Sequence, residues 1–247
     1  MLPHERQQSL TAMLESEGRV VVSHVARTWG VSEMTVRRDL RSLEQRGVVA
    51  RIHGGAVAGG GLRWNSRAQR NRREKTAAAA KLVAFLPPRG CIYLDGSTTV
   101  VHLVDELARR GGYTVATNNI DTFQRLTAHA GLESVLVGGA LSRGTDNFVG
   151  PLARRCLDGI AFTAGFFSAY ALHDRFGCSE PAIEDAEVKQ LVGERCERIH
   201  LAVNHHKLGQ QAAGTWDFAA ERAVLATDLD PGADALGPYR PLFTTIV

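Results

Sequence analysis

The chain has 247 residues, of which 44% are hydrophobic and 22% charged, a balance that excludes wholesale disorder and predicts a folded protein of two domains. No stretch reaches the roughly 20 apolar residues that a membrane helix needs, and the first residues are too polar for a secretory signal. The four cysteines are far apart and form no Cys-x-x-Cys pair, which predicts reduced thiols in a cytoplasmic protein rather than a zinc site.

The charge is unevenly distributed along the chain. Residues 1–75 contain 14 Lys and Arg against 7 Asp and Glu, whereas the remainder contains 15 against 19. A basic head on an acidic body indicates that the head meets a polyanion. A basic surface that contacts only solvent would produce the same bias, so the charge distribution alone does not distinguish the two interpretations and the sequence motifs are needed.

Three short helices are predicted in the basic head. The first covers 4–17, with Leu10, Met13 and Leu14 at helical spacing. The second runs over 23–29 with Ser23 as its N-cap, and Gly30 provides the turn. The third covers 33–46, with Ser32 as its N-cap and Gly47 at its end. A seam of Val25, Val31, Val36 and Leu40, together with the small Ala26, would pack the second helix against the third, as in a helix-turn-helix.

Residues 48–57 predict two short strands around a glycine turn, which is the wing of a winged helix-turn-helix. Polar residues near the start of a recognition helix can reach base edges, and arginines beside them can bind phosphates. A small helical bundle without a ligand is the alternative. The residues predicted to contact DNA are Ser32, Glu33, Thr35, Arg37, Arg38 and Arg41 on the third helix, and Arg51 and His53 in the wing.

The predicted domains are a DNA-binding domain over 1–57, a linker over 58–74 and a larger domain over 75–247. The linker begins with three glycines and continues as a basic segment without a long apolar period. It is interpreted as a tether, and the alternative is a segment that touches the DNA backbone or a neighbouring subunit. A helix over 75–85 follows and ends before Pro87 and Pro88.

Short apolar runs alternate with amphipathic stretches from residue 91 onward, which predicts an α/β fold with a largely parallel sheet. The candidate strands are 91–95, 113–117, 133–138, 160–167, 198–203, 223–227 and 243–247. Ligands of such folds gather where the strands end.

Polar residues follow four of these strands. The first loop combines a carboxylate, a glycine and three hydroxyls before a helix start, which predicts an anion site, although a plain helix cap is the alternative. Asparagines, a diglycine and a lysine follow the other three strands. The residues concerned are Asp95, Gly96, Ser97, Thr98 and Thr99, then Asn118 and Asn119, then Gly138 and Gly139, then Lys207. On the helix after Pro181, Glu187 and Lys189 are candidates for the same ligand, although charges at helical spacing more often form a solvated face.

The third helix with its wing resembles the DeoR family of bacterial regulators, through Val31-Ser32-Glu33-Met34-Thr35-Val36-Arg37-Arg38-Asp39-Leu40 and Arg51-Ile52-His53-Gly54-Gly55-Ala56. The larger domain is similar to the sensor domain of that family through Asp95-Gly96-Ser97-Thr98-Thr99, Thr117-Asn118-Asn119, Gly138-Gly139, Phe148-Val149-Gly150-Pro151 and Lys207-Leu208-Gly209.

This resemblance implies a winged helix-turn-helix followed by a Rossmann-like α/β sensor domain related in fold to ribose-5-phosphate isomerase. It also implies a phosphorylated sugar or a related intermediate as effector, with Ser97, Thr98 and Thr99 at the phosphate and Asp95, Asn118, Asn119, Gly139 and Lys207 around the sugar. The chain departs from the family at Asn204, where an aspartate is expected, and at His206, where a small hydroxyl residue is expected.

The function predicted is repression of a sugar-catabolic operon, with release from a double-stranded DNA operator by a phosphorylated sugar or a related intermediate; an activator is the alternative. Paired DNA-binding domains would meet half-sites about one DNA turn apart, or a multiple of it, which predicts a homo-oligomer, either a dimer or a tetramer. An isomerase is disfavoured, since the acidic segment expected of such an enzyme is replaced by Leu157-Asp158-Gly159-Ile160-Ala161-Phe162. The hypothesis of a metal-responsive regulator that binds its metal through His205 and His206 is less favoured still, because adjacent residues on a strand rarely face one metal. No catalytic residue, cofactor or metal is predicted.

Overall fold

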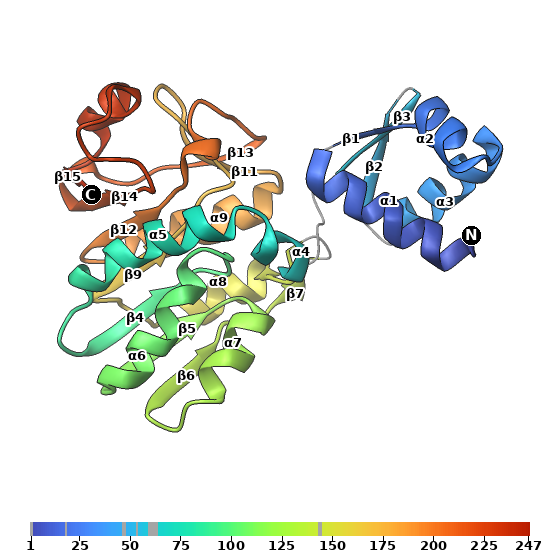
Figure 1. Cartoon of the computed structure of the whole chain (residues 1–247). Coiled ribbons are helices and arrows are strands. Elements are labelled where there is room, and N and C mark those ends of the chain that lie inside the picture. The colour runs from blue at the N-terminus through green and yellow to red at the C-terminus, as the bar shows by residue number, and fades with distance from the viewer. Residues whose placement is uncertain (1, 18, 46–47, 53, 59–63, 143–144) are drawn as a thin grey trace. The chain divides into compact units, whose positions relative to one another are not determined.

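The computed structural model describes residues 2–17, 19–45, 48–52, 54–58, 64–142 and 145–247. The chain divides into two compact units, one of residues 1–70 with 143–145 and one of residues 71–142 with 146–247 (Figure 1). His53, which the sequence assigned to DNA contact, and Gly47, expected to end the third helix, lie outside the described residues.

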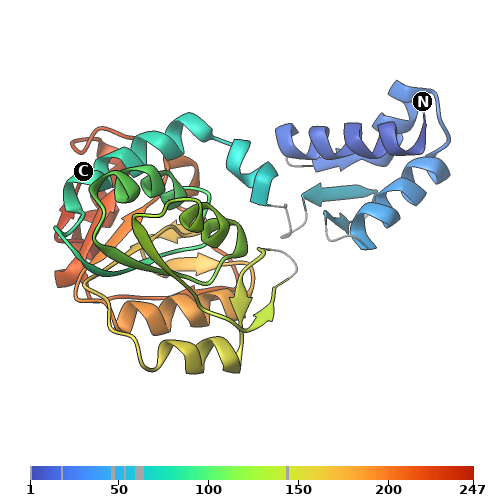
Figure 2. The same cartoon turned by 90° about the horizontal axis from the view of Figure 1, so that it is seen from below.

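The first unit is a winged helix-turn-helix, as predicted. Three strands form an antiparallel sheet in the order β1-β3-β2 against three helices (Figure 2). The predicted wing strands pair from Val49↔Ala58 to Ile52↔Gly55, and the pairing partner β1 was not predicted. The elements are α1 (Pro3–Glu17), β1 (Arg19–Val21), α2 (Val22–Trp29), α3 (Glu33–Gln45), β2 (Val49–Ile52) and β3 (Gly55–Ala58).

Two local signals shape the turn between α2 and α3. Gly30 has φ 64°, a left-handed conformation that glycine adopts without strain, and it ends α2 as predicted. The Ser32 hydroxyl accepts the Thr35 N–H at 3.1 Å, which confirms the predicted N-cap of α3. The predicted cap of α2 was wrong: the helix begins at Val22, one residue before Ser23, and its N-cap Val21 makes no side-chain hydrogen bond.

An apolar seam and one buried ion pair hold the first unit together. The predicted seam residues Val25, Val36 and Leu40 are fully or almost fully buried, while Val31 is partly buried beside them. Asp39 is also buried, and its carboxylate accepts Arg6 Nε of α1 at 2.7 Å. This pair fixes α3 against α1, so the acidic residue of the third helix has a structural role.

Within the first unit, α4 (Trp64–Gln69) lies in the segment that was expected to be a tether. The second unit then begins with α5 (Arg72–Leu82), which starts three residues before the helix predicted from 75 and continues as the 3-10 turn η1 (Val83–Phe85). The buried residues of α5 recur at the three- and four-residue spacing of one helix face, so this helix packs along one side: Lys75, Ala78, Ala79 and Leu82.

The second unit is built on a seven-stranded parallel sheet in the order β15-β14-β12-β9-β4-β5-β6, and each strand overlaps one of the seven predicted segments, with β4 and β6 beginning one residue earlier than predicted. The α/β class with a parallel sheet is thereby confirmed. The strands are β4 (Gly90–Leu94), β5 (Tyr113–Thr117), β6 (Leu132–Leu136), β9 (Ala164–Phe167), β12 (Ile199–Ala202), β14 (Ala223–Ala226) and β15 (Thr245–Ile246).

Helices cover both faces of this sheet. Figure 2 shows α8 and α9 on one face, and α5, α6 and α7 on the other. The chain leaves β4 toward β5 on one side, whereas β9 and the later strands lie on the other side. The carboxyl ends of β4 and β9 therefore form the topological switch point. The helices are α6 (Val104–Arg110), α7 (Ile120–Thr127), α8 (Pro151–Leu157) and α9 (Ile183–Glu194).

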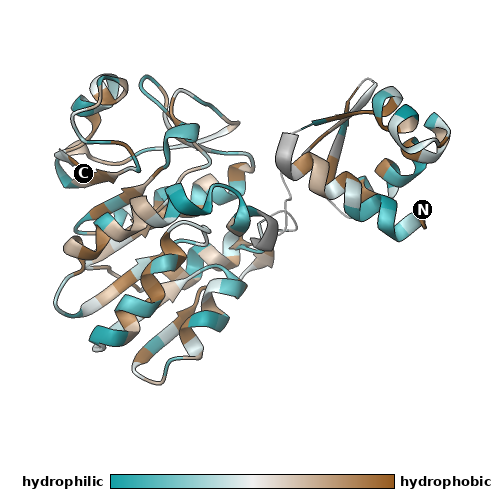
Figure 3. Ribbon diagram, viewed as in Figure 1, coloured by the Kyte–Doolittle hydropathy of each residue, from teal (hydrophilic) through white to brown (hydrophobic). Residues whose placement is uncertain are grey.

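The remaining strands form two small sheets, one of β7 (Ala140–Leu141) and β8 (Phe148–Val149), the other of β10 (Ala171–His173), β11 (Gly177–Glu180) and β13 (Gly214–Trp216). Short 3-10 segments complete the unit: η2 (Val100–Leu103), η3 (His205–Lys207), η4 (Ala220–Arg222) and η5 (Asp234–Leu242). Hydrophobic residues concentrate on the strands and on the inward faces of the helices (Figure 3). Among the described helices, none combines the length and apolar character needed to cross a bilayer.

Candidate functional site

The outward face of α3 carries the exposed residues that the sequence predicted to contact DNA. Val36, Asp39, Leu40 and Leu43 are buried, so the opposite side of a 3.6-residue helix presents the positions between them. Of the six predicted DNA-contacting residues on this helix or at its cap, Thr35 is half-buried and the others are exposed: Ser32, Glu33, Arg37, Arg38 and Arg41.

The arginines of this face differ in their partners. Arg37 forms an ion pair with Glu33 one turn earlier, at 3.0 Å. In the part of α3 that the structure describes, Arg38 and Arg41 form no ion pair with a carboxylate. In the wing, Arg51 Nε binds the Glu44 carboxylate at 2.6 Å, which lowers the pKa of Glu44. Arg38 and Arg41 are therefore exposed cations of this face whose charge no carboxylate of the described residues pairs with.

The loop after β4 brings the predicted anion-binding residues together at the switch point. A Cβ on Gly96 would lie 2.2 Å from Asn147 Oδ1 and 2.6 Å from Asn119 Cβ, so close packing requires the glycine. The Ser97 hydroxyl accepts the Val100 N–H at 3.2 Å, which is the contact of a helix cap. The helix start predicted after this loop is the short 3-10 segment η2, and the α-helix α6 begins only at Val104.

A lysine that the sequence did not single out completes this loop. Lys75 of α5 is 6% exposed, and its Nζ donates a hydrogen bond to Thr98 Oγ1 at 2.9 Å. Thr98 and Thr99 are themselves buried. The loop therefore combines hydroxyls with an ammonium group, which is the chemistry that binds a phosphate.

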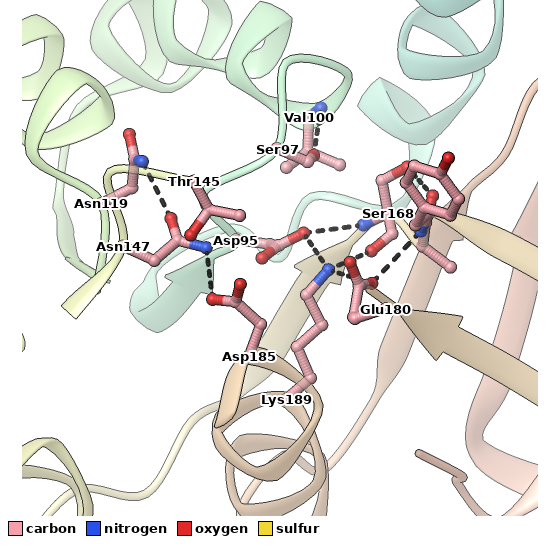
Figure 4. Close-up of polar contacts among 12 residues, drawn as sticks. Asp95, Ser97, Val100, Asn119, Thr145, Asn147, Ser168, Glu180, Asp185 and Lys189 are labelled. Atoms are coloured by element: carbon pink, nitrogen blue, oxygen red, sulfur yellow. Dashed lines mark hydrogen bonds and ion pairs between the residues drawn. The ribbon is translucent and has the colours of Figure 1, made fainter. Parts of the chain in front are cut away.

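A buried ion cluster lies beside the loop (Figure 4). Lys189 Nζ of α9 is 2.7 Å from Glu180 Oε1 and 3.1 Å from Asp95 Oδ2, and it donates to the Ser168 carbonyl at 2.6 Å. Asp95 Oδ2 also accepts the Ser168 N–H at 3.1 Å. The cluster ties β4, β9, β11 and α9 together at the carboxyl edge of the sheet.

The charges of this cluster depend on one another. Burial by itself would lower the pKa of Lys189, but the carboxylates of Asp95 and Glu180 reverse this and raise it. Burial raises the pKa of Glu180, against the opposing effect of Lys189. Lys189 is therefore held as a cation in a site where an unpaired charge would be strongly destabilising.

The asparagines after β5 are used inside the protein. Asn118 Oδ1 accepts the Tyr93 hydroxyl at 2.8 Å, and its Nδ2 donates to the Phe148 carbonyl at 3.0 Å. Asn119 Oδ1 caps α7 by accepting the Thr122 N–H at 2.9 Å. In this conformation the two side chains organise the loops around the site, rather than presenting amides to a sugar.

Hydrogen bonds between side chains connect the loop after β5 to α9. Asn119 Nδ2 donates to Asn147 Oδ1 at 2.8 Å, and Asn147 Nδ2 donates to Asp185 Oδ1 at 2.9 Å (Figure 4). Asp185 and Lys189 are four residues apart and share the buried face of α9. Glu187 lies midway between them and is exposed, so it does not join the cluster.

The other predicted positions are only partly brought to the site. A Cβ on Gly139 would lie 2.6 Å from the Val149 carbonyl oxygen, so this glycine serves packing, and Gly138 has open space around its Cα. Lys207 Nζ donates to Ser168 Oγ at 3.0 Å and to the Ala169 carbonyl, which places it beside the ion cluster.

The sequence did not assign five of these residues to the site: Lys75, Asn147, Ser168, Glu180 and Asp185. Only Asp185 carried a usable signal, because its spacing of four from Lys189 puts both residues on one helix face. The other four lie in segments that tertiary packing alone brings to the switch point.

Comparisons with known proteins agree with this architecture. Residues 6–59 match the model of the DeoR-like helix-turn-helix domain, and residues 70–228 match that of the DeoR C terminal sensor domain. A regulator named YgbI from Escherichia coli is 32% identical over 220 residues, covering 87% of this chain and 85% of its own. A regulator named FruR from Bacillus subtilis is 26% identical, covering 93% of both chains.

The lactose phosphotransferase system repressor of Staphylococcus aureus is 28% identical, covering 85% of this chain and 86% of its own. Among solved structures, ribose 5 phosphate isomerase A from Neisseria gonorrhoeae overlaps 54% of this chain and 52% of its own, at 14% identity and a TM-score of 0.39. An overlap this partial indicates nothing about activity, whereas the sequence relatives are named as transcriptional regulators. The chain therefore belongs to the DeoR family of helix-turn-helix transcriptional regulators.

Proposed function

We propose that this protein represses an operon for sugar catabolism, and that a phosphorylated sugar bound at the carboxyl edge of the parallel sheet releases it from its operator DNA. The names of its relatives support a role in sugar metabolism, the lactose phosphotransferase system repressor above all. The observation that carries the proposal is the pairing of Lys75 with the hydroxyl loop of Thr98, beside the buried cluster of Asp95 and Lys189.

The phosphate would bind at the loop after β4. An ammonium group carries three N–H donors, and the hydroxyls of Ser97 and Thr98 add two more. Hydrogen bonds between charged groups are shorter and stronger than neutral ones. The loop is therefore suited to a phosphate group, and Lys75 would provide the charge.

The sugar would extend from this loop toward the buried ion cluster. Asp95 and Lys207 line that path, and Ser168 links them through its N–H and its hydroxyl. Carboxylate oxygens accept hydrogen bonds from hydroxyls and ammonium groups donate them, so this edge would distinguish a sugar phosphate from inorganic phosphate.

DNA recognition would use the outward face of α3, with Arg38 and Arg41 at phosphates and the residues near Ser32 at base edges. Two half-sites on DNA require two heads, so we propose a cytoplasmic homo-oligomer. An effector that changes how the paired heads are held would abolish simultaneous binding at both half-sites.

The proposal is tested by thermal shift and DNA release with a panel of sugar phosphates and their unphosphorylated parents. Operator DNA is first selected from a random library with the purified protein. At least one phosphorylated sugar should both stabilise the protein and release this DNA, while its unphosphorylated parent should do neither. If no phosphorylated sugar does so, the proposal is wrong.

A matched pair of variants on α5 tests the phosphate site. Lys75→Met should weaken the response to the sugar phosphate by about 10- to 100-fold, because a charge-assisted hydrogen bond is lost. Lys81→Met is the control, since Lys81 Nζ binds the Leu229 carbonyl at 2.9 Å at the other end of the helix. Equal responses from the two variants would place the phosphate elsewhere.

A further inference from the structure

α8 and α9 form the outer layer on one face of the parallel sheet (Figure 2). α8 buries Ala153 and Leu157 toward the sheet. Because a helix has 3.6 residues per turn, Leu152 and Arg155 lie on its outward side, and both are exposed. Leu152 is 56% exposed, so the outward side of α8 places a large apolar side chain beside a cation.

α9 presents a different pattern on the same face of the sheet. Opposite its buried residues, side chains recur at spacings of four, three and four positions and form one stripe: Ile183, Glu187, Gln190 and Glu194. Ile183 is 59% exposed, and both glutamates are exposed as well. The outward stripe of α9 therefore places a large apolar side chain beside two carboxylates.

A groove of about 350 Å³ lies between α9, β13 and Arg154 of α8. Ile183 and Leu191 contribute apolar surface to its lining, while Glu187 and Glu194 contribute carboxylates. Such a groove suits a side chain with an apolar stem and a cationic end, which is the chemistry of arginine and lysine. The groove therefore favours a basic segment as its occupant.

α8 is itself a basic segment of this kind. Among the described residues, Arg155 of α8 and Glu187 of α9 form no ion pair, so both charges are available to a second molecule. A two-fold axis would place α8 of each copy against α9 of the other and fill both grooves at once. A purely basic or purely acidic partner would complement only one of the two helices, whereas a second copy of this chain complements both.

Resting on the proposed function, which requires paired DNA-binding units, we propose that the outward face of α8 and α9 joins two copies of this chain about a two-fold axis. Arg155 of each copy extends into the groove of the other copy and pairs with Glu187 there. Leu152 and Ile183 form the apolar part of the interface. Complementary charges of this kind fix the register of two surfaces, while apolar side chains at the centre exclude water.

The test reverses one charge at a time in the full-length protein and measures self-association by sedimentation equilibrium over a range of concentrations. The two interface variants are Glu187→Arg and Arg155→Glu. Asp105→Arg is the matched control, because Asp105 is a 95% exposed carboxylate on α6, which covers the opposite face of the sheet.

Each interface variant alone should weaken self-association by about 100-fold or more, because the two-fold axis brings like charges together twice. Asp105→Arg should associate as the unaltered protein does. An equal mixture of Glu187→Arg and Arg155→Glu should associate again, since α8 of each variant then meets an opposite charge on α9 of the other. Recovery in the mixture also requires that both variants are folded.

Two results would overturn the inference and leave the proposed release of DNA by a sugar phosphate standing. One is that the interface variants associate as well as Asp105→Arg, and the other is that their mixture stays dissociated. If the unaltered protein is a monomer at every concentration, the inference and the proposed homo-oligomer are both wrong.

Discussion

His200 makes the stability of the second unit depend on pH in a way that can be calculated. The imidazole is buried between Phe166 at 4.8 Å and Phe85 at 5.4 Å, measured between ring centroids. Burial, with a smaller contribution from the charge of Arg198, lowers the pKa of His200 from 6.5 to about 4. The folded protein therefore keeps this histidine neutral over a range in which the unfolded chain protonates it.

The sign and size follow from proton linkage. Between pH 6.5 and about 4 the unfolded state binds more protons, so the free energy of unfolding falls as the pH falls through this window. The stabilisation is fully present above pH 6.5. Each pKa unit corresponds to about 1.4 kcal/mol, which gives a total loss of about 3 kcal/mol and a loss of about 2 kcal/mol between pH 7 and pH 5.

Urea denaturation at pH 7 and pH 5 measures this effect, with His200→Leu as the comparison. Leucine has a similar volume and no titrating group, so the variant should be about 2 kcal/mol less sensitive to this change of pH than the unaltered protein. Taking the difference between the two proteins cancels the contributions of the other titrating groups. Equal sensitivity in the two proteins would show that His200 is not held neutral, and would refute the reasoning.

Two further predictions concern the DNA-binding unit. Arg38→Ala should lower affinity for the selected operator by about tenfold and reduce the salt dependence of binding by about one counterion. Arg37→Ala should lower the affinity less, because Arg37 is already paired with a carboxylate. Equal losses of affinity for the two variants in a salt titration would contradict this prediction. Asp39→Ala removes the carboxylate that accepts from the largely buried guanidinium of Arg6 and should destabilise this unit by about 3 kcal/mol. Arg51→Ala, which removes an exposed pair, should change stability by less than about 1 kcal/mol. Calorimetric unfolding measures the stability of both variants. Comparable losses of stability in Asp39→Ala and Arg51→Ala would show that the Asp39 ion pair does not stabilise the fold.

The sequence by itself determined the order of the elements. The seven segments assigned to strands all enter one parallel sheet, because buried parallel strands are continuous apolar runs separated by turn residues. Gly30 and Ser32 predicted the turn before α3 for local reasons, a left-handed backbone and a side-chain cap. Such signals act within a few residues and can be read directly from the chain.

Tertiary structure decided which polar residues share a site. Lys75 and Thr98 are 23 residues apart, yet they meet at the switch point. Glu180 and Asp95 are farther apart still, and both bind Lys189 there. Glu187 and Lys189 were equal candidates in the sequence, but the helix buries one and exposes the other, since two residues on a helix face nearly opposite ways. Asn118 could not be told from a ligand-binding amide until its partners were known. Local propensity fixes a backbone within each segment, whereas burial and side-chain pairing depend on segments brought together only by the folded sheet.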